Sequence, residues 1–180
     1  MAQYSDYGLV IETSIKSSIK NLSMSQSNLY PGEEAFYTIQ LYPDSRLPST
    51  TAFKIKTPRE IEIVRAESED CYIDSSRKVK NVCYYSGTNT LEIQKGLRHI
   101  SGQDYYGQIT IVFKAFNPPS NFYEGIELVL EISLDETWNF PIASIEGGLS
   151  ASFECNYPCM SCSPFDANNC ESCPEGNREK

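Results

Sequence analysis

Histidine is nearly absent from this chain of 180 residues, and its scarcity removes several kinds of catalytic and metal site. His99 is the only histidine, so a Ser-His-Asp, Cys-His or mixed His/carboxylate site would have to include it. Its flanking residues are typical of a loop between strands. The chain also lacks a Gly-rich phosphate loop and a GxSxG turn. We therefore expect a protein that is not an enzyme and that holds no cofactor.

Long apolar runs are missing as well. No stretch is long enough to cross a membrane, so we expect no membrane insertion by this segment. The net charge of -9 repels nucleic acid and anionic lipid surfaces. Residues 1–6 have neither the basic nor the apolar region of a signal peptide, and residues 176–180 do not resemble a domain end. We expect the chain to be a segment of a larger protein.

Alternation of apolar and polar residues is the main pattern that is present. It is clearest from Ile126 to Leu134, as in a half-buried antiparallel strand. Short strands separated by turn residues are typical of a sandwich or barrel, and we predict an all-β, antiparallel β-sandwich. Further strands are expected near residues 9–15, 37–41, 53–55, 61–63, 91–93, 109–113 and 149–153.

Composition changes sharply at Cys155. The 154 residues before it contain two cysteines, whereas the 26 residues from Cys155 onward contain five and few large apolar side chains. Such a tail cannot build its own core, so covalent cross-links must hold it. We predict three parts: an extra N-terminal strand or the end of a preceding domain in residues 1–17, the sandwich in residues 18–154, and a short disulfide-rich segment in residues 155–180. A short helical turn is one interpretation of residues 166–170.

Two cysteines, Cys71 and Cys83, belong to the sandwich and have 11 residues between them. We expect them to pair and to close a hairpin or a loop between neighbouring strands. In the chain-entropy model a loop of this size stabilises the fold by about 3 kcal/mol. Two unrelated buried thiols are the alternative.

The tail carries two CxxC pairs, an arrangement that four-cysteine zinc sites also use. Seven residues separate the pairs, which is fewer than zinc sites usually have, and a zinc site would leave one tail cysteine over. We favour a disulfide framework whose odd member pairs beyond Lys180. Its cysteines are Cys155, Cys159, Cys162, Cys170 and Cys173.

The tail sequence Cys-Asn-Tyr-Pro-Cys-Met-Ser-Cys, followed by Asn-Asn-Cys-Glu-Ser-Cys-Pro-Glu-Gly, resembles the furin-like or growth-factor-receptor-type cysteine-rich repeat. It is especially similar to repeats in large surface proteins of ciliates and related protists. The resemblance implies that Cys155 pairs with Cys162 and Cys159 with Cys170. Cys173 would then await a later partner.

The residues before the tail resemble the Ig-like or adhesin-like sandwich that often precedes such repeats. The similar features are Pro31-Gly32 before a strand, Thr57-Pro58 after one, and Ile109-Thr110-Ile111 running to Asn117-Pro118-Pro119. This resemblance implies an Ig-like fold in a cell-surface or extracellular-matrix protein, and it brings no catalytic residues.

Three further features are candidates for sites. Asn21-Leu22-Ser23 is an N-glycosylation sequon, so Asn21 is a candidate acceptor. Trp138 would either pack at the end of the sandwich or serve as a binding hot spot. The carboxylates that could hold a structural calcium ion, or simply lie in solvated turns, are Glu67, Glu69, Asp70, Asp135 and Glu136.

The sequence favours a non-catalytic extracellular module for adhesion or recognition. Its partner would be a protein or glycan on a cell surface, or copies of itself. The second interpretation is a structural subunit of an extracellular filament or surface coat. Residues 1–17, with their alternating pattern, would then be a candidate donor strand for a neighbouring copy.

Overall fold

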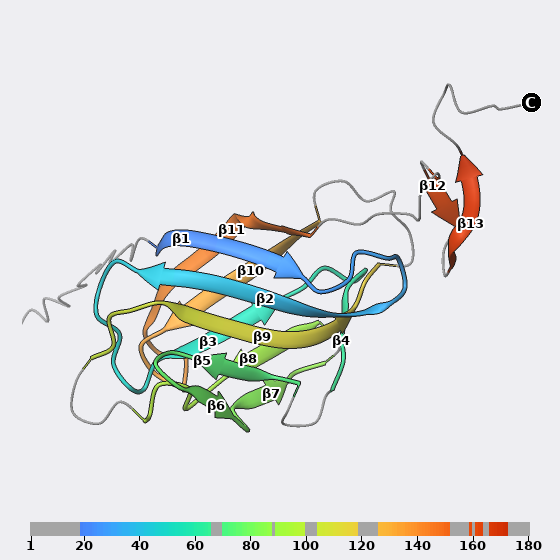
Figure 1. Ribbon diagram of the computed structural model, residues 1–180. Helices are drawn as coiled ribbons and strands as arrows, with labels where there is room; N and C mark the ends of the chain where they lie inside the picture. Colours follow the sequence, from blue (N-terminus) through green and yellow to red (C-terminus); the bar gives the residue numbers. More distant parts are fainter. Residues whose placement is uncertain are drawn as a thin grey trace, which may run out of the picture.

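Two antiparallel sheets lie face to face in the computed structural model (Figure 1), which describes residues 19–65, 70–87, 89–99, 104–118, 126–151, 159, 161–163 and 166–172. The first sheet has the strand order β1-β2-β9-β5-β6, and β4 pairs with β9 beside β5. Its strands are β1 (Ile19–Gln26), β2 (Glu34–Pro43), β4 (Glu62–Ile63), β5 (Tyr72–Asp74), β6 (Lys78–Lys80) and β9 (Ile109–Phe116).

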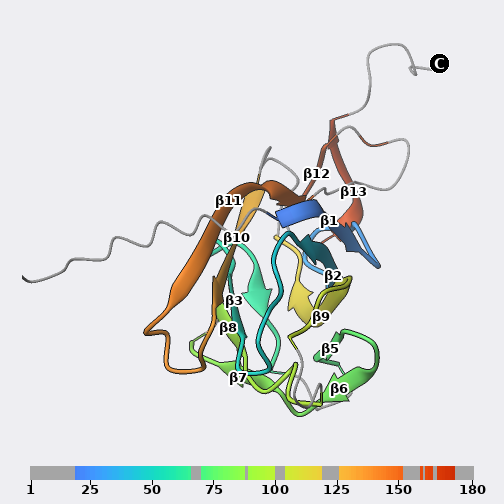
Figure 2. The ribbon, with the colours of Figure 1, turned by 90° about the vertical axis from the view of Figure 1, so that its left-hand side faces the viewer.

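The second sheet has the order β11-β10-β3-β8-β7. Figure 2 shows the two layers nearly edge on, with this sheet on one side and the first sheet on the other. A separate two-stranded sheet follows, made of β12 (Ser161–Ser163) and β13 (Asp166–Ser172). The strands of the second sheet are β3 (Ala52–Lys56), β7 (Cys83–Tyr85), β8 (Thr90–Ile93), β10 (Ile126–Ser133) and β11 (Pro141–Ala151).

The core lies between the sheets because each long strand buries alternate residues. On β2, Tyr37, Ile39 and Leu41 are almost wholly buried, while the side chains between them are not. The ring of Tyr37 stacks on Phe113 of β9 with 5.4 Å between centroids. Burial of each such apolar side chain stabilises the fold by about 1.5–3 kcal/mol. The period-two pattern in the sequence therefore has its cause in this interface.

The two lateral sides of the sandwich are closed in different ways. On one side, β1 and β11 each contain a bulge, and Leu22 packs toward the core near Gly148. On the other side, a disulfide joins Cys71, just before β5, to Cys83 at the start of β7. The Cys71–Cys83 bond therefore links the two sheets. The sequence predicts that it closes a hairpin or a loop between neighbouring strands, whereas the loop that it closes contains the whole β5–β6 hairpin.

The structure confirms the all-β antiparallel Ig-like sandwich and the disulfide-rich end of the chain. One local expectation was wrong, because residues 166–170 belong to β13 and form no helical turn. The strand expected near residues 149–153 is present, in its described part, as the end of a longer β11 that starts at Pro141. Residues 1–17 lie outside the described part, so the extra strand stays a prediction. Within the described residues no helix is long and apolar enough to span a membrane.

Candidate functional site

The loop between β10 and β11 is organised around one carboxylate. Oδ1 of Asp135 accepts hydrogen bonds from the Ser133 hydroxyl at 2.8 Å and from the Phe140 backbone N–H at 3.1 Å. The Thr137 hydroxyl donates to Oδ2. These donors, Thr137 first, hold the pKa of Asp135 below its usual value. The hydrogen bonds to the ionised carboxylate thus fix the conformation of the loop.

Two contacts fix this loop to the rest of the sandwich. The Arg98 guanidinium donates to both carboxylate oxygens of Glu136, at 2.9 and 2.8 Å. The Thr50 hydroxyl donates to the Leu134 carbonyl at 2.6 Å. A bidentate Arg–carboxylate pair fixes orientation as well as distance. The loop is therefore held in one geometry before any partner arrives.

Trp138 occupies a strained position in this loop. Its φ is 61°, in the left-handed region that bulky residues rarely adopt. The Lys54 ammonium lies 3.9 Å from the centroid of its ring, and the same ammonium pairs with Glu92 at 3.0 Å. The Trp138 Nε1 is buried and has no hydrogen-bond partner among the described residues. The loop thus presents the ring at a conformational cost, a pattern found at functional sites.

A hollow of about 480 Å³ lies beside the Trp138 ring on the outer face of the second sheet. Its walls are Lys54, Glu131, Trp138 and residues 141–144. Next to it, the side chain of Phe140 is 64% exposed, the largest value among the large apolar side chains that the structure describes. An aromatic rim around charged and hydroxyl-bearing walls suits a ligand with both apolar and polar faces. We define the Trp138 site as this hollow together with Phe140.

The polar wall of the Trp138 site follows from strand register. Ser144, Glu131, Lys54 and Glu92 are direct neighbours across β11, β10, β3 and β8. Alternation places each of them on the outer face, but only the pairing brings them into one row. Sequence reasoning pointed to Trp138 and missed Lys54, Glu131 and Phe140. Alternation in the sequence places Lys54 and Glu131 on outward-facing positions. Without the strand register, it does not show that the two side chains lie next to each other.

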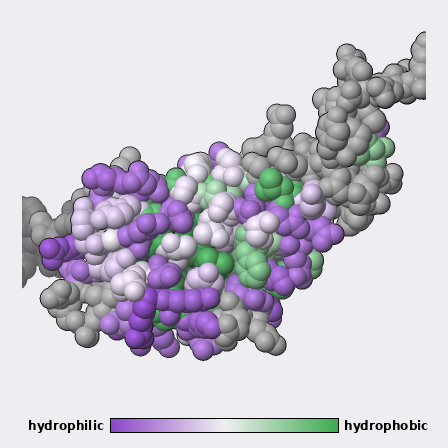
Figure 3. Space-filling model, in the orientation of Figure 1, coloured by the Kyte–Doolittle hydropathy of each residue, from purple (hydrophilic) through white to green (hydrophobic). Residues whose placement is uncertain are grey.

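The outer face of the first sheet is a second exposed area with aromatic side chains. Figure 3 shows green and pale side chains near its middle, with purple ones around them. Two of its rings are already covered by cations: Lys78 lies 3.6 Å from the ring centroid of Tyr72, and Lys114 lies 5.9 Å from that of Phe36. A nearby ammonium does not distinguish this face from the Trp138 site, because Lys54 lies 3.9 Å from the centroid of the Trp138 ring.

His99 contacts a serine hydroxyl, as the histidine of a Ser-His-Asp site does. Its Nε2 lies 3.1 Å from the Ser76 hydroxyl, on the β5–β6 turn. Its Nδ1 is buried and has no hydrogen-bond partner in the described part of the chain. A Ser-His-Asp site needs a carboxylate at that nitrogen to hold the imidazole and stabilise its charged form. The described residues thus supply a Ser–His contact without the third member.

The carboxylates considered for calcium are placed as follows. Asp135 and Glu136 are engaged by the loop and by Arg98, as described above. Glu67 and Glu69 lie outside the described residues, and Asp70 directly precedes Cys71. No group of three or more metal-ligating side chains occurs among the residues that the structure describes.

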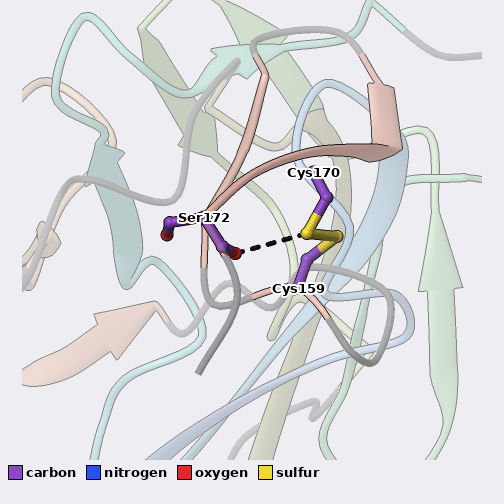
Figure 4. The surroundings of a disulfide bond; sticks show 3 residues. All are labelled: Cys159, Cys170 and Ser172. Atoms are coloured by element: carbon purple, nitrogen blue, oxygen red, sulfur yellow. Dashed lines mark hydrogen bonds between the residues drawn. A yellow bond between two sulfur atoms is a disulfide. The ribbon is translucent and has the colours of Figure 1, made fainter. Parts of the chain in front are cut away.

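The tail contains a second disulfide. Figure 4 shows Cys159 bonded to Cys170, with the Ser172 carbonyl oxygen 3.2 Å from Cys170 Sγ. Because that sulfur carries no hydrogen, the contact is a close approach of sulfur to oxygen. This is the pair that the furin-like resemblance implied. Cys155, Cys173 and the side chain of Cys162 lie outside the described residues.

Asn21 lies in the β1 bulge. The ladder with β2 loses its regular register between Lys20 and Ser23, and Asn21 has a φ of 52°. Both Asn21 and Ser23 are exposed. The sequon is therefore accessible in the folded protein.

Comparison with known proteins gave structural likenesses only. No family model matches the chain, and no curated protein matches it. The N-terminal domain of a Streptococcus gordonii adhesin shares 13% identity at a TM-score of 0.45, over 76% of this chain and 34% of that one. The major pilin subunit of Bacillus cereus shares 11% at 0.43, over 72% and 38%. The collagen-binding domain of a Staphylococcus aureus adhesin shares 9% at 0.40, over 72% and 96%.

These structural neighbours are adhesin and pilin domains, and the chain spans about a third of the length of the first two. TM-scores below 0.5 make none of them a guide to ligand or partner.

Proposed function

We propose that this chain is a non-catalytic extracellular module for adhesion or recognition within a larger surface protein that carries furin-like repeats. The observation that carries the proposal is the Trp138 site. A strained tryptophan and an exposed phenylalanine are held on a loop that one carboxylate, one bidentate ion pair and one hydroxyl fix in place. Rigid aromatic side chains of this kind bind partners with little loss of conformational entropy.

The cysteines support the extracellular part of the proposal. Both described disulfides, Cys71–Cys83 and Cys159–Cys170, favour an oxidising compartment, because cytosolic thiols are kept reduced. The partner in this proposal is a protein or glycan on a cell surface.

The test is binding of the fluorescently labelled, oxidised chain to intact cells. We expect Trp138→Ala and Phe140→Ala each to weaken binding at least tenfold, as hot-spot truncations do. Tyr84→Ala is the matched control, because Tyr84 is 41% exposed on the same sheet but at its β7 edge. Prior treatment of the cells with protease or with glycosidases separates a protein partner from a glycan. Binding of Trp138→Ala and Phe140→Ala as strong as that of the native chain and Tyr84→Ala would contradict the proposal.

The second candidate is a structural subunit of an extracellular filament or surface coat. The observation that favours it is β1, an eight-residue edge strand that starts at Ile19, two positions after the alternating segment 1–17. Edge strands pair readily with further chains. We expect the intact chain then to assemble with rising concentration in sedimentation velocity, and the chain without residues 1–17 to stay monomeric. Monomers in both cases would remove this candidate.

A further inference from the structure

The β1 bulge opens a hollow of about 310 Å³ between β1 and β2. Residues 21–23 form one wall, residues 40–42 form another, and Gln108 completes it. Ligand sites in proteins start at about 300 Å³, so this hollow suits one sugar ring and not a long oligosaccharide. All three residues of the Asn21-Leu22-Ser23 sequon line it. A sugar attached to Asn21 would therefore start at the edge of a cavity of its own size.

The chemistry of the walls matches a sugar. Amides of Gln40 and Gln108 and the hydroxyl of Ser23 supply hydrogen-bond donors and acceptors for sugar hydroxyl and N-acetyl groups. Tyr42 adds an aromatic ring, whose face can pack against the apolar C–H face of a hexose. Amides and an aromatic ring in one small hollow suit an amphipathic ring better than an ion or a purely apolar group.

The ring of Tyr42 packs against a second aromatic ring. Tyr106 lies against it edge to face, with 5.6 Å between ring centroids, and is itself 52% exposed. Next to them, Lys20 pairs with Asp44 at 2.7 Å. Edge-to-face aromatic pairs have a preferred geometry, so the Tyr42 ring is positioned before any sugar is present.

We infer that Asn21 carries an N-linked glycan and that the hollow at the β1 bulge seats its first sugar against Tyr42. The inference rests on the proposed extracellular function, because the modification takes place in the secretory pathway. There, a lipid-diphosphate-linked oligosaccharide is the donor. The Asn21 amide nitrogen forms a bond to the anomeric carbon and loses a proton, while the bond from that carbon to the diphosphate breaks and the lipid diphosphate leaves.

The seat has a physical consequence for the fold. Contact of the first sugar with Tyr42 of β2 holds the irregular segment of β1 between Lys20 and Ser23 in place. The bulge is thus the site of attachment and also gains stability from it.

The test uses the full chain secreted from a eukaryotic host. Intact mass should show one glycan on the native chain and none on Asn21→Gln or Ser23→Ala. An endoglycosidase that leaves only the first sugar then gives the decisive sample. We expect its Tm to exceed that of Asn21→Gln by about 2–4 °C, the shift that a single favourable contact gives in a chain of this size. The same gain should persist in Tyr84→Ala and disappear in Tyr42→Ala.

Each other outcome overturns part of the inference. No glycan on a chain whose Cys71–Cys83 bond has formed would overturn the modification and leave the proposed function standing. A glycan whose first sugar gives no gain in Tm, or the same gain in Tyr42→Ala, would overturn the seat. If Tyr42→Ala fails to fold, amide exchange replaces it: the first sugar should slow exchange in residues 40–42, and unchanged exchange there contradicts the seat.

Discussion

The hydroxyl of Tyr37 donates a hydrogen bond of 2.7 Å to Oδ1 of Asn117, which lies 80 residues further along the chain. The amide of Asn117 donates in turn to the carbonyls of Asn28 and Tyr30, at 3.0 and 2.9 Å. One buried side chain thereby ties the β1–β2 loop to the end of β9. Burial raises the pKa of Tyr37, so its hydroxyl keeps the proton that it donates.

Asn117→Ala should lower the free energy of unfolding by about 1–3 kcal/mol, because it leaves buried donors and acceptors without partners. Asn139→Ala is the control, since Asn139 is exposed and its side-chain amide donates to Thr137 within its own loop. Urea unfolding of the three proteins measures the difference. Equal midpoints for Asn117→Ala and the native chain would contradict a structural role for this network.

Replacing both Cys71 and Cys83 with alanine should lower the free energy of unfolding by about 3 kcal/mol. The physical reason is that the unfolded chain regains the freedom that the loop closure removes. The matched control is the pair Cys159→Ala and Cys170→Ala, which lies outside the sandwich and should leave the unfolding midpoint of the sandwich unchanged. Both double variants are compared by urea unfolding under oxidising conditions. A larger loss from the control pair would show that the tail supports the sandwich.

The Trp138 loop should loosen in acid. The donors around Asp135 lower its pKa in the folded state, so they stabilise the ionised form. That contribution is complete above the ordinary Asp value of about 3.9 and is lost as the pH falls through the lower folded value. Because Trp138 is the only tryptophan, its fluorescence reports the loop directly. We expect an acid transition in the native chain and none in Asp135→Asn, with far-UV circular dichroism as the check on global unfolding.

Gly148→Ala should lower the free energy of unfolding by about 1–2 kcal/mol, because its φ of 82° lies in the left-handed region. Gly148→Asn should lose less, since asparagine adopts this region more readily. Thermal unfolding of the two variants measures the ranking. A loss from Gly148→Asn as large as that from Gly148→Ala would contradict a requirement set by backbone conformation, because a Cβ at this position meets only Leu22, at 4.0 Å.

Alternation in the sequence predicted the strands around β2, β9 and β10 because each of these strands buries one face between the two sheets. It did not predict the full length of β11, where Gly147 and Gly148 interrupt the pattern with a bulge. The spacing of Cys71 and Cys83 suggested that they form a disulfide. That this disulfide links the two sheets could not be predicted, because it depends on the turn between β6 and β7, where the chain passes to the second sheet.

The Trp138 site could be predicted only in part. Trp138 stood out as the single tryptophan in a turn-rich segment. Lys54 and Glu131 are 77 residues apart, and only the β3–β10 register makes them neighbours. The role of Asp135 depends on hydroxyl and amide donors that converge once the loop is closed. Long-range pairing of this kind leaves no local pattern in a single sequence.

The inter-sheet disulfide also sets how this module would respond to tension. β1 starts at one end of the sandwich and β11 ends toward the other, so a pull on the chain runs along the strands (Figure 1). The twelve residue steps from Cys71 to Cys83 span about 40 Å when extended, yet the bond holds their α-carbons 6.2 Å apart. The segment from Cys71 to Cys83 cannot extend under force as long as the bond is intact. A reducing agent would release it, and a single-molecule force trace would record a longer final extension.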